Sequence, residues 1–178
     1  MVRVPFSGRQ VNGWVLETDI QPEEGINLLP LSKYRSVGPS QEVIELARWA
    51  AHRWAGRLNR FLTTASPPKN VPSLKKHQAA SGEVNNTRHE TVWFQEVAKR
   101  KKAVLRLPPS LDAISIASEF VIKGNTLILS PSISGAHKLA AGLKRMGLHV
   151  SVVPEQWQNA AVGGSVVGSR SAAFAPIV

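Results

Sequence analysis

The C-terminal part of the chain alternates strand-like and helix-like segments, and no other feature of the sequence constrains the fold so strongly. Apolar runs typical of strands lie at 103–107, 126–130, 149–154 and 165–168. Helical patterns lie between them, at 112–123, 134–146 and, over a shorter stretch, 155–164. Asp112 can cap the first of these helices and Gly124 can end it. Strands that alternate with helices form parallel sheets with right-handed crossovers, so this part is predicted to be α/β.

The N-terminal residues carry a different strand signal. Apolar residues alternate with other residues from Val2 to Phe6 and again from Val11 to Val15, with a glycine-containing turn at 7–9. A period of two on both sides of such a turn predicts a β-hairpin over 1–17. Residues 28–34 are a candidate for a further strand.

A helix is predicted to begin after Ser40, whose hydroxyl can accept a hydrogen bond from an unpaired backbone N–H. Glu42 and Glu45 lie near the positive end of its dipole. The residues expected to face a core at helical spacing are Val43, Leu46, Ala47, Ala50 and Trp54. The arginines expected on the remaining surface, toward phosphate or water, are Arg48, Arg53, Arg57 and Arg60. The N-terminal part is therefore predicted to be a small β-rich module followed by a helix.

The composition changes between these two parts. Residues 64–92 are rich in proline, serine and asparagine and show no hydrophobic period, which is typical of a linker. We therefore expect three units, at 1–63, 64–92 and 93–178.

Positive charge is concentrated around this linker. The chain has a net charge of +10, and residues 53–102 contain eleven Lys and Arg against three Glu. Such a block favours polyanionic partners, because Lys and Arg release counterions condensed on phosphates. The charge predicts nucleic-acid binding, although a solubilising linker would have the same composition.

The turn before the helix at 112–123 is the place where many α/β proteins hold phosphate. A phosphate-cradling loop needs glycines whose N–H groups point inward, together with a lysine and a hydroxyl. Here the turn contains Pro108 and Pro109, which have no N–H, and the nearest downstream lysine, Lys123, lies at the far end of the helix. We therefore expect no ATP binding of the usual kind at this turn.

Other chemical signals are weak. The glycines at 163, 164 and 168 resemble a dinucleotide motif but precede a strand, so a tight turn is the better interpretation. The five histidines show no paired spacing typical of metal ligands, and no nucleophile–base arrangement is visible. The chain is therefore expected to have no catalytic residues, no nucleotide-binding residues and no metal site.

Tryptophans near the basic block could stack on the bases of a single strand. Trp49 and Trp54 are more readily interpreted as core residues of an amphipathic helix, and Trp93 flanks the block on its other side. Trp14, expected to be exposed beside Arg9, is the better candidate for stacking.

The N-terminus lacks the apolar region of a signal peptide, and no apolar run approaches the roughly 18 residues that span a bilayer. Cysteine is absent, which fits a reducing compartment. These features predict a soluble, cytoplasmic protein without a membrane partner.

Three stretches resemble one family in the same order along the chain: VRVPFSGRQVNGWVLE, PSQEVIELARWAAHRWAGRLNRFLTTASPP and GGSVVGSRSAAFAPIV. They are similar to primosomal protein N′, the replication-restart protein PriA. The resemblance implies a module that binds the 3′ end of a nascent DNA strand, followed by a RecA-like helicase core. Short versions with few motifs occur among actinobacterial members, and this chain reads as a degenerate or truncated member with an incomplete RecA-like sheet.

The resemblance also implies individual DNA-binding residues. Gly8 matches the turn where the family's backbone approaches the terminal nucleotide, although a simple hairpin glycine would look the same. Arg3 and Arg9 could contact phosphate. Ser169, Arg170 and Ser171 match a motif that touches the backbone of a single strand, with an ion pair to an acidic neighbour as the alternative for Arg170.

The departures from the family affect its cofactors. The phosphate loop is replaced by RLPPSLD, the acidic Walker B motif would follow Pro176, and the zinc-binding cysteines are absent. The ATP and zinc expected for the family are therefore not supported by this chain.

We therefore expect a DNA-binding replication-restart and repair protein, bacterial and nucleoid-associated, without helicase activity. Its partners would be forked or 3′-ended DNA, single-strand DNA-binding protein and helicase-loading proteins. The alternatives are an ATP-dependent 3′–5′ DNA helicase whose motor motifs are lost or lie outside the chain, and a generic basic nucleic-acid adaptor.

Overall fold

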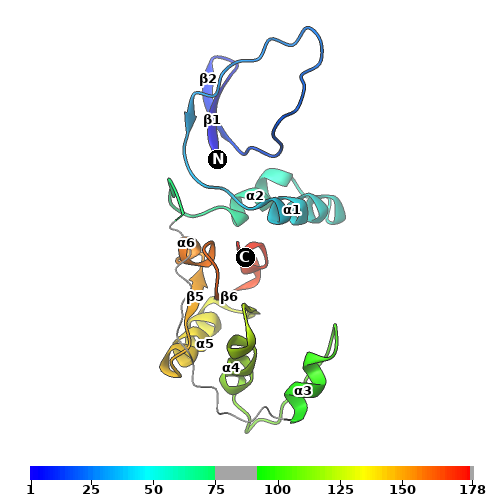
Figure 1. The fold of residues 1–178 in the computed structure, drawn as a ribbon, viewed down its shortest axis with the longest axis vertical. Coiled ribbons are helices and arrows are strands. Elements are labelled where there is room, and N and C mark those ends of the chain that lie inside the picture. The colour runs from blue at the N-terminus through cyan, green and yellow to red at the C-terminus, as the bar shows by residue number, and fades with distance from the viewer. Residues whose placement is uncertain (75–91, 177–178) are drawn as a thin grey trace.

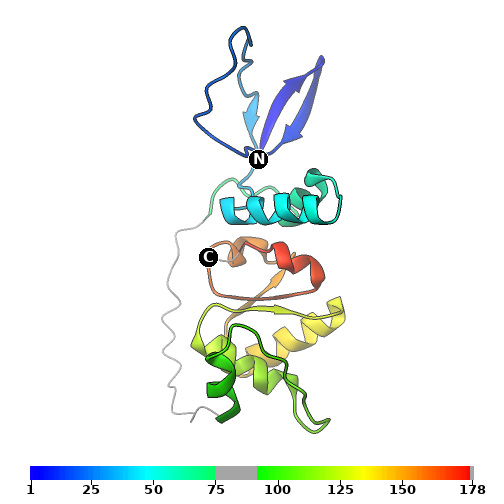
Figure 2. The same cartoon turned by 90° about the vertical axis from the view of Figure 1, so that its right-hand side faces the viewer.

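A computed structural model describes residues 1–74 and 92–176. A small antiparallel sheet and two helices form the N-terminal part, and a parallel sheet with helices forms the C-terminal part (Figure 1). The two views show the helix pair between the antiparallel sheet and the C-terminal part (Figure 2). The chain is therefore an α/β protein, as the sequence predicts.

The antiparallel sheet contains β1 (Val2–Phe6), β2 (Arg9–Gly13) and β3 (Lys33–Tyr34), in the order β2-β1-β3. Ser7 and Gly8 form the two-residue turn of the hairpin, and both have positive φ, 47° and 74°. A turn with positive φ at both central residues matches the right-handed twist of the strands. The predicted hairpin is confirmed, and the further strand expected at 28–34 is confined to β3.

The helix pair consists of α1 (Gln41–Arg53) and α2 (Leu58–Ala65). The buried residues of α1 are Val43, Ile44, Ala47 and Ala50. Leu46 and Trp54, which the sequence placed in the core, are exposed instead. Ser40 occupies the N-cap position, but its side chain makes no capping hydrogen bond.

The C-terminal part begins with α3 (Val92–Ala98) and α4 (Ala113–Lys123). The remaining elements are β4 (Leu127–Leu129), α5 (Ile133–Arg145), β5 (Val150–Val153), α6 (Trp157–Ala160), β6 (Ser165–Gly168) and a 3-10 helix, η1 (Arg170–Phe174). The three strands are parallel in the order β4-β6-β5. The Asp112 cap is also confirmed, since its Oδ1 accepts from the Ile114 N–H at 3.0 Å.

The strand predicted at 103–107 is wrong. These residues form no strand, and Val104 is 96% exposed. An apolar run becomes a strand only where a neighbouring strand satisfies its N–H and C=O groups. Within the described residues, the parallel sheet offers the run no such pairing.

The two parts meet at the end of α2. The indole N–H of Trp157 donates to the Ala65 carbonyl at 2.8 Å, and Trp157 packs with Val71 and Ala161. Val71 is fixed in turn by Ser36, whose Oγ accepts from the Val71 N–H at 2.9 Å. Because α2 runs to Ala65 and Val71 is buried, any linker starts later than residue 64. The rest of the predicted linker, at 75–91, lies outside the described residues.

None of the helices in the described ranges is long and apolar enough to cross a membrane.

Candidate nucleic-acid interface

One face of the antiparallel sheet carries a row of cations. The strand register places Arg3 between Asn12 of β2 and Lys33 of β3. Residues directly opposite each other on neighbouring strands share a face of the sheet. Arg3 and Lys33 are both exposed, and Arg35 reaches the same row, because its Nη1 donates to Asn12 Oδ1 at 3.4 Å. We call Arg3, Lys33 and Arg35 the cationic row.

Sequence reasoning missed Lys33 and Arg35. Their spacing of two is the signal of a strand face, but only pairing of β3 with β1 brings them beside Arg3. Arg9, in contrast, lies opposite Phe6 and so on the other face from Arg3. The structure therefore separates two arginines that the sequence grouped together.

Gly8 lies at the exposed tip of the hairpin. Its φ of +74° is unfavourable for other residues, and nothing lies within 4 Å of where a Cβ would be. The turn geometry accounts for this glycine, and the open space leaves its backbone accessible. A DNA contact at Gly8 stays a prediction.

Trp14 is not the exposed aromatic that the sequence suggested. It is half-buried against the cluster of Ile44, Ala47 and Leu62, and its indole N–H donates to Ser66 Oγ at 2.8 Å. The expectation that Trp14 is exposed is therefore wrong, and a stacking contact at Trp14 stays a prediction.

Two tryptophans at the C-terminal half and the C-cap of α1 are more exposed than the sequence suggested. Trp49 and Trp54 were expected in the core, but they are 55% and 60% exposed. The core is filled by a neighbouring stripe of smaller side chains, which includes Ile44 and Ala47. Exposed aromatic rings are therefore available on α1 rather than next to the hairpin.

A second polar surface lies at the carboxyl ends of the parallel strands, where α/β sheets usually hold their ligands. Ser169 follows β6, and the exposed Arg170 begins η1. Among the described residues no acidic side chain forms an ion pair with Arg170, so its alternative role is not observed there. Ser169 Oγ lies 3.4 Å from Ser171 Oγ.

The start of α5 lies beside this segment. The Ser130 N–H donates to the Gly168 carbonyl at 2.8 Å, which joins the end of β4 to the end of β6. Ser132 Oγ then caps α5 by accepting from the Gly135 N–H at 3.1 Å. Sequence reasoning missed these hydroxyls, because only the parallel pairing of β4 and β6 brings them near Ser169.

Gly168 holds η1 close to the sheet. A Cβ at this position would collide with Ala172 Cβ and lie 3.0 Å from Val153 Cγ2. The glycine therefore permits the close approach that positions Ser169 to Ser171.

The described residues do not fit the family's cofactors. Because no strand at 99–112 leads into α4, the 108–111 segment is a turn of an exposed loop, and the Leu111 N–H closes it by donating to the Pro108 carbonyl at 3.0 Å. The chain contains no cysteine, and the described part groups no three potential metal ligands. Gly163 and Gly164 have φ of 110° and 99° and form the tight turn that the sequence predicted.

The N-terminal part is a small sheet with a cationic face followed by a helix pair, and such a face is complementary to a polyanion such as nucleic acid. Residues 1–67 match the family model of the PriA 3′ DNA-binding domain (3′BD). This match supports a PriA-family 3′ DNA-binding module at the N-terminus, which bears out that part of the resemblance. No curated protein and no solved structure shows a significant match to the chain. The likeness of the C-terminal part to a helicase core stays a prediction.

Proposed function

We propose that the chain is a replication-restart protein that recognises forked or 3′-ended DNA by binding alone. The observation that carries this proposal is the cationic row on a module of the 3′ DNA-binding family. In this proposal phosphates lie along Arg3, Lys33 and Arg35, while the backbone at Gly8 approaches the strand end. Arg9 meets the duplex from the other face of the hairpin.

The C-terminal part supplies a second contact in this proposal. Ser169, Arg170 and Ser171 bind the backbone of the displaced single strand, supported by the exposure of Arg170. Residues 93–178 then act as a degenerate helicase-like scaffold rather than a motor. The partners are helicase-loading proteins and single-strand DNA-binding protein on the nucleoid of a bacterial cytoplasm.

Fluorescence anisotropy with a forked DNA carrying a 3′ end and a blunt duplex of equal length tests this proposal. We expect tighter binding to the fork and a steep loss of affinity with salt, because phosphate contacts release counterions. Arg3→Ala with Lys33→Ala should weaken fork binding about tenfold or more, given about 1.5–3 kcal/mol for contacts between charged groups. Lys99→Ala with Arg100→Ala removes the same charge from an exposed site elsewhere and is the control.

Equal affinity of the wild type for the fork and the duplex would contradict recognition of strand ends. DNA-stimulated ATP hydrolysis by this chain would favour the helicase alternative, and indifference to all DNA structure would favour a generic basic adaptor.

A further inference from the structure

A continuous series of aromatic rings runs from α1 to η1. The ring centroids of Trp49 and Trp54 lie 5.4 Å apart in an edge-to-face contact. Those of Trp54 and Phe61 lie 6.4 Å apart with planes 24° from parallel. Phe61 then contacts Phe174 of η1 at 5.6 Å, in the element that begins with Arg170. We call Trp49, Trp54 and Phe61 the aromatic surface.

This surface is apolar and open to solvent. More than half of each tryptophan side chain is exposed, and Phe61 is half-buried between them and η1. Large contiguous apolar patches on a protein surface usually mark an interaction site. The α1–α2 core is formed by Ile44, Ala47 and Leu62, and the two tryptophans lie outside it with more than half of their surface exposed.

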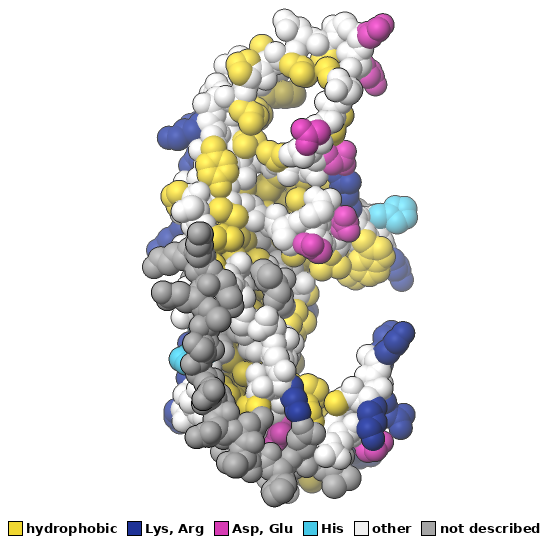
Figure 3. Space-filling model, viewed as in Figure 1, with side chains coloured by type: hydrophobic (Ala, Val, Ile, Leu, Met, Phe, Trp, Pro, Cys, Tyr) yellow, Lys and Arg dark blue, Asp and Glu magenta, His cyan; other side chains and the backbone are white. Residues whose placement is uncertain are grey.

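The charges around the aromatic surface indicate what covers it. Arg53, Arg57 and Arg60 are exposed, and no described acidic residue pairs with any of them. Figure 3 shows hydrophobic side chains beside the helix pair, with Lys or Arg side chains, a histidine and Asp or Glu side chains around them.

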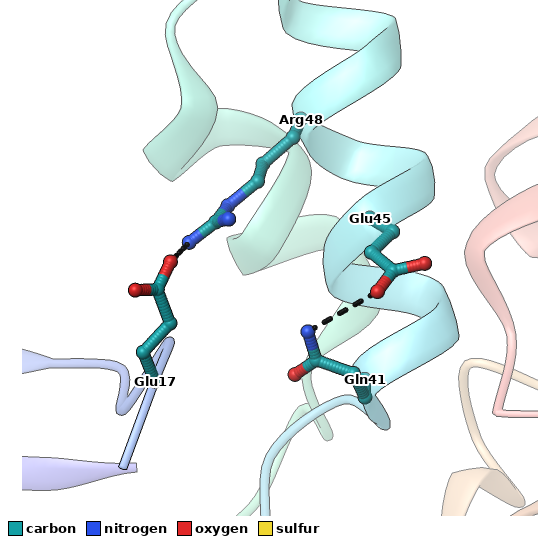
Figure 4. A network of polar contacts seen from close by, with 4 residues as sticks. All are labelled: Glu17, Gln41, Glu45 and Arg48. Carbon is teal, nitrogen blue, oxygen red and sulfur yellow. Dashed lines mark hydrogen bonds and ion pairs between the residues drawn. The ribbon is translucent and has the colours of Figure 1, made fainter. Parts of the chain in front are cut away.

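The acidic residues near α1 have other contacts. Glu17 pairs with Arg48 at 2.5 Å, and Glu45 accepts from Gln41 Nε2 at 3.3 Å (Figure 4). Gln41 is neutral, so Glu45 keeps its negative charge, as does Glu42 in the first turn of the same helix. The charged side chains at the C-terminal end of α1 and in the first turn of α2, where Trp54 and Phe61 lie, are Arg53, Arg57 and Arg60. This end of the helix pair is therefore positively charged, which is complementary to a polyanion and repels another copy of the same basic face.

We propose that single-stranded DNA stacks its bases on the aromatic surface and places its phosphates against Arg53, Arg57 and Arg60. This inference rests on the proposed function and adds a path between the hairpin module and the Ser169–Ser171 segment. Every base has a π-face, so rings flanked by cations bind single strands without reading their sequence. The contact of Phe61 with Phe174 directs such a strand toward Arg170.

Two double variants separate stacking from simple apolar contact. The Trp49→Leu, Trp54→Leu variant keeps apolar volume but removes the π-faces, and we expect it to bind an oligo(dT) strand about ten- to a hundredfold more weakly. The Trp49→Phe, Trp54→Phe variant keeps the π-faces and should stay within a few-fold of wild type. Both tryptophans are exposed, so the fold should persist in both variants, as far-UV circular dichroism will check.

A charge test accompanies the ring test. Replacing Arg53, Arg57 and Arg60 by alanine should reduce the slope of log affinity against log salt by about 2, at about 0.7 per phosphate contact on a single strand. Replacing Arg100, Lys101 and Lys102 by alanine removes the same charge from exposed positions. This control should keep a salt slope close to that of the wild type. Equal slopes for both triple variants would overturn the assignment.

Other outcomes also decide the proposal. Unchanged oligo(dT) affinity in the leucine variant overturns it, and the proposed function survives if Arg3→Ala with Lys33→Ala still weakens fork binding. A wild type that binds neither fork nor oligo(dT) overturns both. Sedimentation that shows a wild-type dimer, dissociated by the leucine changes without loss of oligo(dT) binding, would assign the aromatic surface to a second copy instead.

Discussion

Replacing Trp157 by phenylalanine tests how the two parts of the chain are joined. Trp157 is 3% exposed, and its indole N–H donates to the Ala65 carbonyl at 2.8 Å. Phenylalanine keeps most of the ring but has no N–H, so a buried acceptor loses its donor. Such an orphaned group costs about 1–3 kcal/mol.

The smaller ring also leaves space beside Val71 and Ala161. A partial cavity adds about 1 kcal/mol, so the free energy of unfolding should fall by about 2–4 kcal/mol. Because small proteins are stable by only about 5–15 kcal/mol, this is a large change. With a slope of about 2 kcal/mol per molar urea, the midpoint should fall by about 1–2 M.

Urea unfolding followed by far-UV circular dichroism measures this change, and Trp14→Phe is the matched control. Trp14 also donates an indole N–H, to Ser66 Oγ, but its ring is only half-buried. Ser66 Oγ keeps its own bond to the Leu62 carbonyl at 2.6 Å, so the control should lose only about 1 kcal/mol. A Trp157→Phe midpoint no lower than that of Trp14→Phe would refute the reasoning.

Three further changes test other parts of the fold. Ser36→Ala orphans the buried Val71 N–H and should lower the unfolding free energy by about 1–3 kcal/mol in urea titrations, and an unchanged midpoint would contradict the role of Ser36. Gly168→Ala should cost about 1–3 kcal/mol from the contacts with Ala172 and Val153, and a protein of wild-type stability would show that η1 yields easily. The pKa of Glu42 is lowered from 4.5 by the hydrogen bond to its own backbone N–H and then by the Ser40 hydroxyl, so its contribution to stability is complete above pH 4.5 and is lost as the pH falls through the lowered value. Glu42→Gln should therefore lower the urea midpoint of unfolding at neutral pH, and this midpoint should approach that of the wild type in acid. A difference between the two midpoints that does not change with pH would contradict this reasoning.

Local patterns were sufficient for the elements whose signals lie within a few residues. The hairpin follows from alternation around Gly8, and α4 follows from the Asp112 cap and the glycine after Lys123. The parallel sheet follows from strands separated by helices. In each case the chemistry that begins or ends the element is adjacent to it in sequence.

The predictions that failed concern residues whose structure depends on strands or helices distant in sequence. Residues 103–107 are apolar like β4, but only β4 has a neighbouring strand with which to pair. Ile44 and Trp49 both lie at apolar positions of α1, and the sequence of the helix alone does not decide which of them is buried in the core. For the same reason the sequence located Arg3 but not Lys33, which joins the cationic row through pairing of β3 with β1.

Two tryptophans donate hydrogen bonds to the C-terminal end of α2. Trp14 of the N-terminal part donates to the Ser66 hydroxyl, and Trp157 of the C-terminal part donates to the Ala65 carbonyl. We therefore expect a displacement of the hairpin to reach the parallel sheet through these two adjacent residues. In mechanical terms, we expect this short joint to couple the orientation of the hairpin to that of the Ser169 segment.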